Sequence, residues 1–337
     1  MTKRIRQTIS GGPRRAVRIH AAIVALFAAN CTQTYDAGYN LLPVDRRNPV
    51  VLMNDGLNDN WQGEYAVLLA NSGWPRLVGI VVGKGGTAFD PDANFTAWQG
   101  LVNAAVASGL RGIPDPVKVD SELLKRPESG NIEETVPNYS DGALFLRWAA
   151  ETYALPDRPL VVVTGTRLTD VADAYLIDPT IVDRVVVVSS LGSLTATGAT
   201  MANPNGEMDP WADTIVTAHF RYIQISVFYD QTADIPASRV PELPANEFGD
   251  WMADKQPGIW DLPVASDQVA ILAVWVPGFV TGVERVSPAG PVDAGATIGP
   301  ELLKDPNGPV MLVSQIDYDA ARRAIWRLLD SPATFGK

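Results

Sequence analysis

The most constraining feature of this sequence is a series of short, continuous apolar runs rich in β-branched residues. They cover residues 49–53, 77–82, 160–163, 185–188, 223–229 and 310–313. Runs of this length and composition are typical of strands that are covered on both faces. Helical patterns occur at residues 63–71, 141–153, 209–220, 267–275 and 318–329. This alternation predicts an α/β fold with a mostly parallel central sheet and helices on both faces.

The N-terminal segment differs from the rest of the chain. Its six basic residues precede any acidic residue, the first of which is Asp36, and a short apolar run at residues 21–29 follows them. This order is typical of an export signal, and the run is shorter than the roughly 20 residues of a membrane-spanning helix. We therefore expect an export signal at residues 1–31, a linker at 32–48 and a folded domain at 49–330. A basic helix belonging to the folded domain is the alternative.

The single cysteine, Cys31, directly follows the apolar run. Its surroundings resemble a bacterial lipobox, although Ala28 and Asn30 depart from the usual pattern. One cysteine excludes an intrachain disulfide and a cysteine-based metal site. We expect an exported protein of the bacterial periplasm or cell envelope, either free or lipid-anchored at Cys31 as a lipoprotein.

The charge of the chain limits its partners. The chain has 27 basic and 38 acidic residues, and without the six basic residues of the leader 21 minus 38 leaves −17. Such a surface repels phosphate groups, so we expect no nucleic acid partner. Membrane contact is expected through the lipid anchor alone, and a homo-oligomer is one state of assembly that the sequence leaves open.

Polar residues follow the first predicted strand, where residues 54–60 read NDGLNDN. Ligands bind beyond the carboxyl ends of the strands in such sheets, and clustered oxygen donors suit calcium. A polar turn with Asp59 as helix N-cap is the alternative. Three further polar segments lie where they could reach the same space, at residues 164–165, 203–210 and 266–268.

The order of these four segments resembles the inosine–uridine-preferring nucleoside hydrolases. The family's DxDPGxDD loop is similar to LMNDGLND at residues 52–59, and its TGPLTN segment is similar to TGTRLTD at 164–170. Its EFNxxxDPEAA segment resembles NPNGEMDPWAD at 203–213, and its HDPLA helix start resembles SDQVA at 266–270. The resemblance spans residues 49 to 329 and implies the nucleoside hydrolase fold.

The resemblance also implies a calcium ion. The matching ligands are Asp59, Asp267 and the main-chain carbonyl of Thr164. A further ligand position falls on Asn54 in an ungapped match and on Asp55 after a shift of one residue.

The remaining family positions fall on amides. The water-activating aspartate matches Asn58, and the two ribose-binding residues match Asn203 and Asn205, while Asp267 would bridge the metal and the sugar. From its place beside this loop, Trp211 is a further candidate for ligand contact.

Two departures bear on catalysis. An amide such as Asn58 cannot accept a proton at neutral pH, and Ser266 replaces the family's acid-supplying histidine. We expect His219 to pack beside its helix and not to serve the site. The main hypothesis is an N-glycosidase-like hydrolase in which Asp55 or Asp59 orients a metal-activated water. The alternatives are an inactive nucleoside- or sugar-binding envelope protein and an envelope scaffold.

Overall fold

The computed structural model contains two compact units, residues 1–38 and 39–337. It describes residues 41–56, 70, 76–84, 90–195, 198–200, 205–225, 241–255, 270–271, 273–274, 277–289, 299–321 and 323. The predicted export signal, including Cys31, lies outside these ranges. Part of the predicted linker packs on the domain, because Leu42 and Val44 are buried in its core and the Asn48 side chain donates to the Pro159 carbonyl at 2.8 Å.

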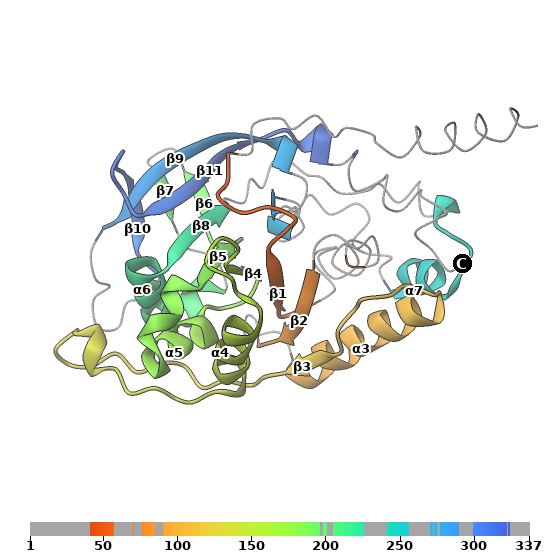
Figure 1. Ribbon diagram of the computed structural model, residues 1–337, viewed down its shortest axis with the longest axis horizontal. Helices are drawn as coiled ribbons and strands as arrows, with labels where there is room; N and C mark the ends of the chain where they lie inside the picture. The colour runs from red at the N-terminus through yellow and green to blue at the C-terminus, as the bar shows by residue number, and fades with distance from the viewer. Residues whose placement is uncertain are drawn as a thin grey trace, which may run out of the picture. The chain divides into compact units, whose positions relative to one another are not determined.

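Eleven strands in the described part of the chain form one sheet (Figure 1). Their order across the sheet is β3-β2-β1-β4-β5-β8-β11-β9-β10-β7-β6. The bounds are β1 Pro49–Asn54, β2 Arg76–Val82, β3 Pro116–Lys118, β4 Leu160–Thr164, β5 Val185–Ser189, β6 Ser193–Thr195, β7 Gly198–Thr200, β8 Arg221–Ile225, β9 Val280–Pro288, β10 Glu301–Lys304 and β11 Val310–Ile316. All pairs from β3 to β11 are parallel, and the pairs from β11 to β6 are antiparallel.

All six predicted apolar runs coincide with strands of the parallel part, which confirms the predicted sheet; residues 226–229 of the fifth run lie outside the described residues. The sequence did not predict the antiparallel strands β6, β7, β9 and β10 or the short strand β3. The burial pattern of β9 explains this, because intermediate or exposed positions interrupt its buried residues. A strand covered in this way has no continuous apolar run.

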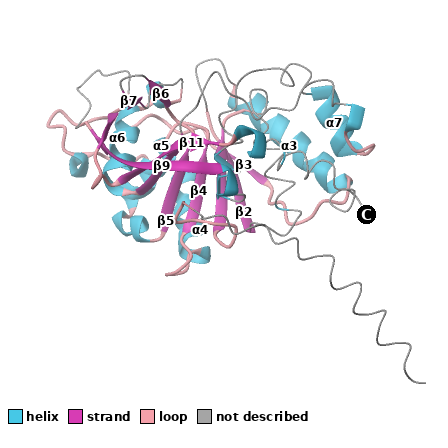
Figure 2. Cartoon of the chain, turned by 90° about the horizontal axis from the view of Figure 1, so that it is seen from above, coloured by secondary structure: helices cyan, strands magenta, loops and turns pink. Residues whose placement is uncertain are grey.

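Helices cover both faces of the sheet, as predicted (Figures 1 and 2). Helices α4 (Asp141–Tyr153), α5 (Thr169–Ile177) and α6 (Pro210–His219) pack on one face. Helices α3 (Pro91–Ala107) and α7 (Glu247–Lys255) contact each other and pack on the opposite face. Short 3-10 turns occur at η1 (Ile132–Glu134), η2 (Pro179–Asp183), η3 (Gly206–Met208) and η5 (Pro277–Phe279).

The predicted helices at 141–153 and 209–220 correspond to α4 and α6. Their starts have local causes: the Ser140 hydroxyl accepts from the Ala143 amide, and the Asp209 carboxylate accepts from the Ala212 amide, followed by proline at the first helical position. The predicted helix at 63–71 lies outside the described residues except for its eighth residue, Ala70, while the described positions within 267–275 and 318–329 are helical.

Residues 119–140, which we call the crossing segment, join β3 to α4 without a long helix or strand. They run past the starts of α5 and α6, where the Leu124 amide donates to the Asp209 carboxylate at 3.1 Å. In the described part of the chain, no helix combines the length and apolar character needed to cross a membrane.

Candidate functional site

The carboxyl ends of β1, β2 and β4 meet at one edge of the sheet. The Gly165 amide donates to the Met53 carbonyl at 3.0 Å, and the Gly83 amide donates to the Asn54 carbonyl at 2.9 Å. At this edge the side chains of Asn54 and Asp55 are buried. Parallel strand order therefore brings the first polar loop and the segment after β4 together, as the sequence indicated.

The asparagine-rich loop reaches the same edge. The side-chain amide of Asn205 donates to the Gly165 carbonyl at 2.9 Å, although the two residues are 40 positions apart. Asn205 immediately precedes η3, so this bond places the start of η3 at the carboxyl end of β4. Three of the four predicted segments thus meet in the described structure.

The turn after β4 is held by its threonines. The Thr164 hydroxyl donates to the Thr166 carbonyl at 3.0 Å, and the Thr166 hydroxyl donates to the Lys84 carbonyl at 3.1 Å. The Thr164 carbonyl already accepts from Ser190, at 3.1 Å from its amide and 3.4 Å from its hydroxyl. A cation bound by this carbonyl would compete with Ser190.

Several predicted site residues lie outside the described part of the chain: Asn58, Asp59, Asn203 and Asp267. Their roles remain predictions. Within the described part, no group of three or more His, Cys, Asp or Glu side chains is placed to hold a metal ion. The oxygen donors of Asn54 and Asp55 suit calcium in kind, but calcium needs six to eight ligands.

Trp211 lies in the buried cluster beneath α6, where its indole N–H donates to the Thr135 hydroxyl at 3.0 Å. The guanidinium of Arg126 stands 5.3 Å from its ring centre. These contacts tie Trp211 to the crossing segment, and its contact with a ligand stays a prediction.

His219 stacks on Tyr175 with ring centroids 4.2 Å apart, and burial lowers its pKa. It packs beside its helix, as expected from the sequence.

A buried arginine that was not predicted from the sequence lies beside the site. Arg167 follows Gly165 and Thr166, is 4% exposed, and donates to the Ser121 carbonyl. Burial raises the pKa of Asp170 and of Asp209, whereas the nearby positive charge of Arg167 acts to lower both. A basic residue so soon after a buried strand was the available signal, since unpaired charges are rarely buried.

Comparison with solved structures identifies the fold. An inosine–uridine-preferring nucleoside hydrolase from Bacillus anthracis superposes with a TM-score of 0.54 at 16% identity, covering 84% of this chain and 99% of that one. A purine-preferring ribonucleoside hydrolase from Gardnerella vaginalis gives 0.54 at 15% identity, covering 83% and 99%. A protein described as an effector gives 0.56 at 14% identity, covering 86% and 94%.

No sequence model of a protein family matches the chain, and no curated protein matches it. At these identities the similarity concerns the fold: the chain has the nucleoside hydrolase fold, as its sequence predicted.

Proposed function

We propose that this protein is an N-glycosidase-like hydrolase that acts on a nucleoside or a related ribosyl compound. The observation that carries the proposal is the bond from the Asn205 side chain to the Gly165 carbonyl, beside the buried Asn54 and Asp55. This bond joins two polar segments, and the bond from the Gly165 amide to the Met53 carbonyl brings them beside the third, at the strand ends where ligands bind in sheets of this kind. Two solved structures of the same fold are described as nucleoside hydrolases.

The proposed roles follow from the chemistry of the side chains. Asn205, together with Asn203, would hold sugar hydroxyls, since amides both donate and accept hydrogen bonds. Asp55 or Asp59 would orient the water that attacks C1′ of the ribosyl group. A calcium ion held by Asp55 or Asn54, Asp59, Asp267 and the Thr164 carbonyl would supply a water of lowered pKa.

A second function has its own support in the sequence. Asn58 stands where the family has its water-activating aspartate, and an amide cannot take a proton from water at neutral pH. Amides keep hydrogen bonds to hydroxyls while losing base function. A catalytically inactive nucleoside- or sugar-binding protein of the cell envelope, exported and free or anchored through Cys31, is therefore the alternative.

One experiment separates the two functions. The purified protein is incubated with a panel of nucleosides, with and without calcium, while ribose release and thermal stability are measured together. Ribose release supports the hydrolase, whereas a thermal shift without release supports the binding protein. If no nucleoside or sugar gives either signal, both proposals are wrong.

Two variants test whether ribose release or the thermal shift arises at this site. We expect Asp55→Ala to lower kcat/KM about 100-fold, the scale of losing a preorganised electrostatic contact. We expect Asn205→Ala to raise KM about tenfold, the equivalent of one hydrogen bond. In a protein that only binds, the same variants weaken the ligand-induced thermal shift.

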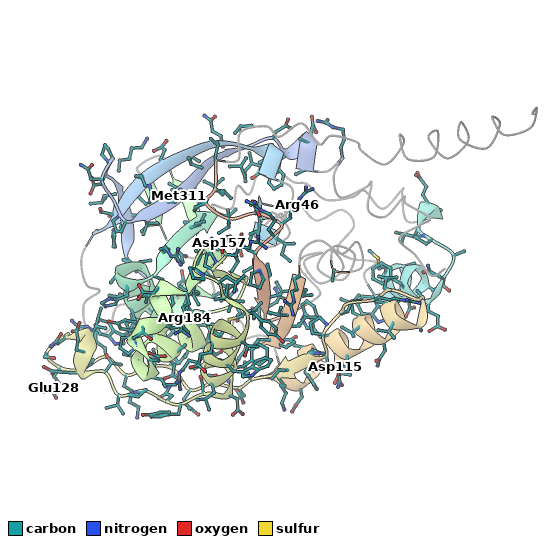
Figure 3. All side chains as sticks on the ribbon, viewed as in Figure 1. Arg46, Asp115, Glu128, Asp157, Arg184 and Met311 are labelled. Atoms are coloured by element: carbon teal, nitrogen blue, oxygen red, sulfur yellow. The ribbon has the colours of Figure 1, made fainter. Side chains whose placement is uncertain are left out.

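The matched control is Asp115→Ala. Asp115 (Figure 3) is an exposed carboxylate just before β3, at the amino end of a strand parallel to β2 and thus at the opposite edge of the sheet. Its loss should leave both signals unchanged. Equal losses from Asp115→Ala and Asp55→Ala would contradict the placement of the site.

A further inference from the structure

Three basic residues stand at or directly after the carboxyl ends of neighbouring strands. Lys84 follows β2, Lys118 is the last residue of β3, and Arg167 lies in the turn after β4. Strands β2 and β4 flank β1, whose end carries Asn54 and Asp55, and β3 lies beyond β2 (Figure 1). Because parallel strands end at the same edge of a sheet, all three cations lie along the edge that carries the candidate site.

The partners of these cations differ. Lys118 forms a hydrogen-bonded ion pair with Asp92, and the buried Arg167 donates to a main-chain carbonyl of the crossing segment. The ammonium nitrogen of Lys84 lies 3.9 Å from the Asp120 carboxylate, which is beyond hydrogen-bond distance, and 41% of the Lys84 side chain is exposed. Of these three cations, Lys84 is therefore the one whose charged group is accessible and loosely held.

The main chain of Lys84 is fixed beside the candidate site. Its carbonyl accepts from the Thr166 hydroxyl at 3.1 Å, and the preceding Gly83 amide donates to the Asn54 carbonyl at 2.9 Å. Thr166 follows Gly165, whose carbonyl holds the asparagine-rich loop. With its four-carbon stem, a lysine side chain reaches across the roughly 5 Å between neighbouring strands. The Lys84 ammonium group can therefore turn over the end of β1 while its main chain stays in place.

Hydrolysis of a purine nucleoside needs a proton donor. When the bond from C1′ to the base breaks, the base takes the electron pair and leaves as an anion unless a ring nitrogen receives a proton. A positioned acid contributes about 100-fold to 10,000-fold to such a step. The chain has two histidines, of which His20 belongs to the expected export signal and His219 stacks on Tyr175 at the end of α6. The proton donor is therefore sought among other residues.

We propose that Lys84 is the general acid that protonates the leaving base, an inference that rests on the proposed hydrolase function. The C1′–N bond breaks with its electron pair going to the base, and a ring nitrogen of the base takes a proton from the ammonium group. Water forms the new bond to C1′ and passes its proton to the carboxylate that orients it. Solvent then returns a proton to Lys84 and removes one from the carboxylate, so that one water is consumed.

This role predicts which substrates depend on Lys84. Inosine needs a proton on its leaving base, whereas the base of nicotinamide riboside is positively charged and leaves as a neutral molecule. Lys84→Met removes the ammonium group and keeps most of the apolar stem. We expect this variant to lower kcat/KM for inosine about 100-fold and to hydrolyse nicotinamide riboside as fast as the wild type.

A second variant separates proton transfer from charge. Lys84→Arg keeps the positive charge, but a guanidinium group does not give up its proton in a protein. We therefore expect it to be as slow on inosine as Lys84→Met. Lys118→Met is the matched control, because it removes the cation at the end of the neighbouring strand β3, and it should leave both rates unchanged. Thermal unfolding checks that each variant is folded.

Three results would overturn this role of Lys84. Equal losses on both substrates in Lys84→Met would show that the residue shapes the site without donating a proton. Recovery of inosine hydrolysis in Lys84→Arg would show that charge alone is required. A wild-type chain that hydrolyses nicotinamide riboside but no purine nucleoside would lack the acid, although the proposed hydrolase function would stand. If the wild type hydrolyses neither substrate, the hydrolase function is itself wrong, and the role of Lys84 is wrong with it.

Discussion

The two faces of the sheet are covered by helices of different character. In the described parts of α3 and α7, the buried side chains are apolar apart from Asn94. Beneath α5 and α6, on the other face, four aspartates are buried: Asp170, Asp173, Asp209 and Asp213. The same sheet therefore has one face held by apolar packing and one on which carboxylates are part of the interior.

Three of these carboxylates hold the crossing segment. Asp170 accepts from the hydroxyls of Ser121 and Ser140, and Asp173 accepts from the amides of Asn138 and Ser140 at 2.7 and 2.8 Å. A segment with little helix or strand cannot satisfy its own backbone amides, and buried amides need partners. The carboxylates at α5 and α6 provide the hydrogen-bond acceptors for these amides. Buried acidic side chains can therefore hold a long non-helical connection against a core.

The fourth carboxylate, Asp213, is different. Both of its oxygens are buried and make no hydrogen bond within the described structure, and burial raises its pKa well above 3.8, with a further contribution from Asp209. Burial raises the pKa of Tyr222, and the nearby charge of Asp213 raises it further. An ionised Asp213 therefore destabilises the folded protein. At Asp209, hydrogen bonds offset part of the same cost of burial.

The sharpest test of this contrast removes a carboxylate that holds the crossing segment. Asp209→Ala loses bonds from the Leu124 and Ala212 amides and from the Thr169 hydroxyl. We expect the free energy of unfolding to fall by about 3 kcal/mol, measured by urea denaturation, because a buried amide is left unsatisfied.

Asp90→Ala is the matched control on the other face. Asp90 is the N-cap of α3, but it is exposed and accepts one bond, from the Asp92 amide at 3.0 Å. We expect it to cost about 1 kcal/mol. Equal effects of the two substitutions would mean that Asp209 acts as an ordinary helix cap.

The next prediction tests how tightly side chains pack around Asp170, on the sheet face covered by α4, α5 and α6. A Cβ atom at Gly142 of α4 would lie 2.5 Å from Cγ of Asp170. Because Ser121 and Ser140 hold Asp170 in place, Gly142→Ala should lower the free energy of unfolding by about 2 kcal/mol, despite the higher helix propensity of alanine. At Gly278 an added Cβ meets no atom within 4 Å, so Gly278→Ala should leave the free energy of unfolding almost unchanged. Urea denaturation measures both variants.

The smallest effect is a pH dependence. Burial gives Asp213 a higher pKa in the folded protein than in the unfolded chain, where it is near 3.8. The free energy of unfolding therefore falls as the pH rises from the unfolded-state pKa to the folded-state pKa. The slope for one group is at most about 1.4 kcal/mol per pH unit. Asp213→Asn should therefore flatten the fall in stability between pH 4 and neutral pH, while Asp170 and Asp209 keep a residual slope of the same sign.

Denaturation midpoints of the wild type, Asp213→Asn and Asp115→Asn at several pH values check this. The Asp115 variant should follow the wild type because its side chain is exposed. A slope unchanged in Asp213→Asn would show that Asp213 ionises in the folded protein as it does in water.

The parallel half of the fold was predictable because its strands are buried on both faces. Residues 160–163 and 185–188 consist of leucine and valine, and each run forms all but the last residue of a fully buried strand. The antiparallel half was not, because β9 is only partly covered and carries Glu284 and Arg285 within it. Local composition reports how a strand is covered, and partial covering leaves a weak pattern.

The candidate site was predictable in part for a related reason. Polar loops after apolar runs indicated Asn54, Asp55 and Asn205, whereas no local pattern singled out Arg167. The aspartates of residues 164–170 and 203–213 show the limit of motif comparison: Asp170 and Asp209 lie within the matched segments, yet their side chains bind the crossing segment.

By itself the sequence determined the alternation of strands and helices and the edge of the sheet at which polar loops gather, because these depend on local burial and chain order. Its resemblance to the nucleoside hydrolases implied which α/β fold they build. Only the tertiary structure decided which carboxylates are occupied by the protein's own amides and hydroxyls, and that Asn205 contacts Gly165. These features depend on contacts between residues tens of positions apart, which no local pattern records.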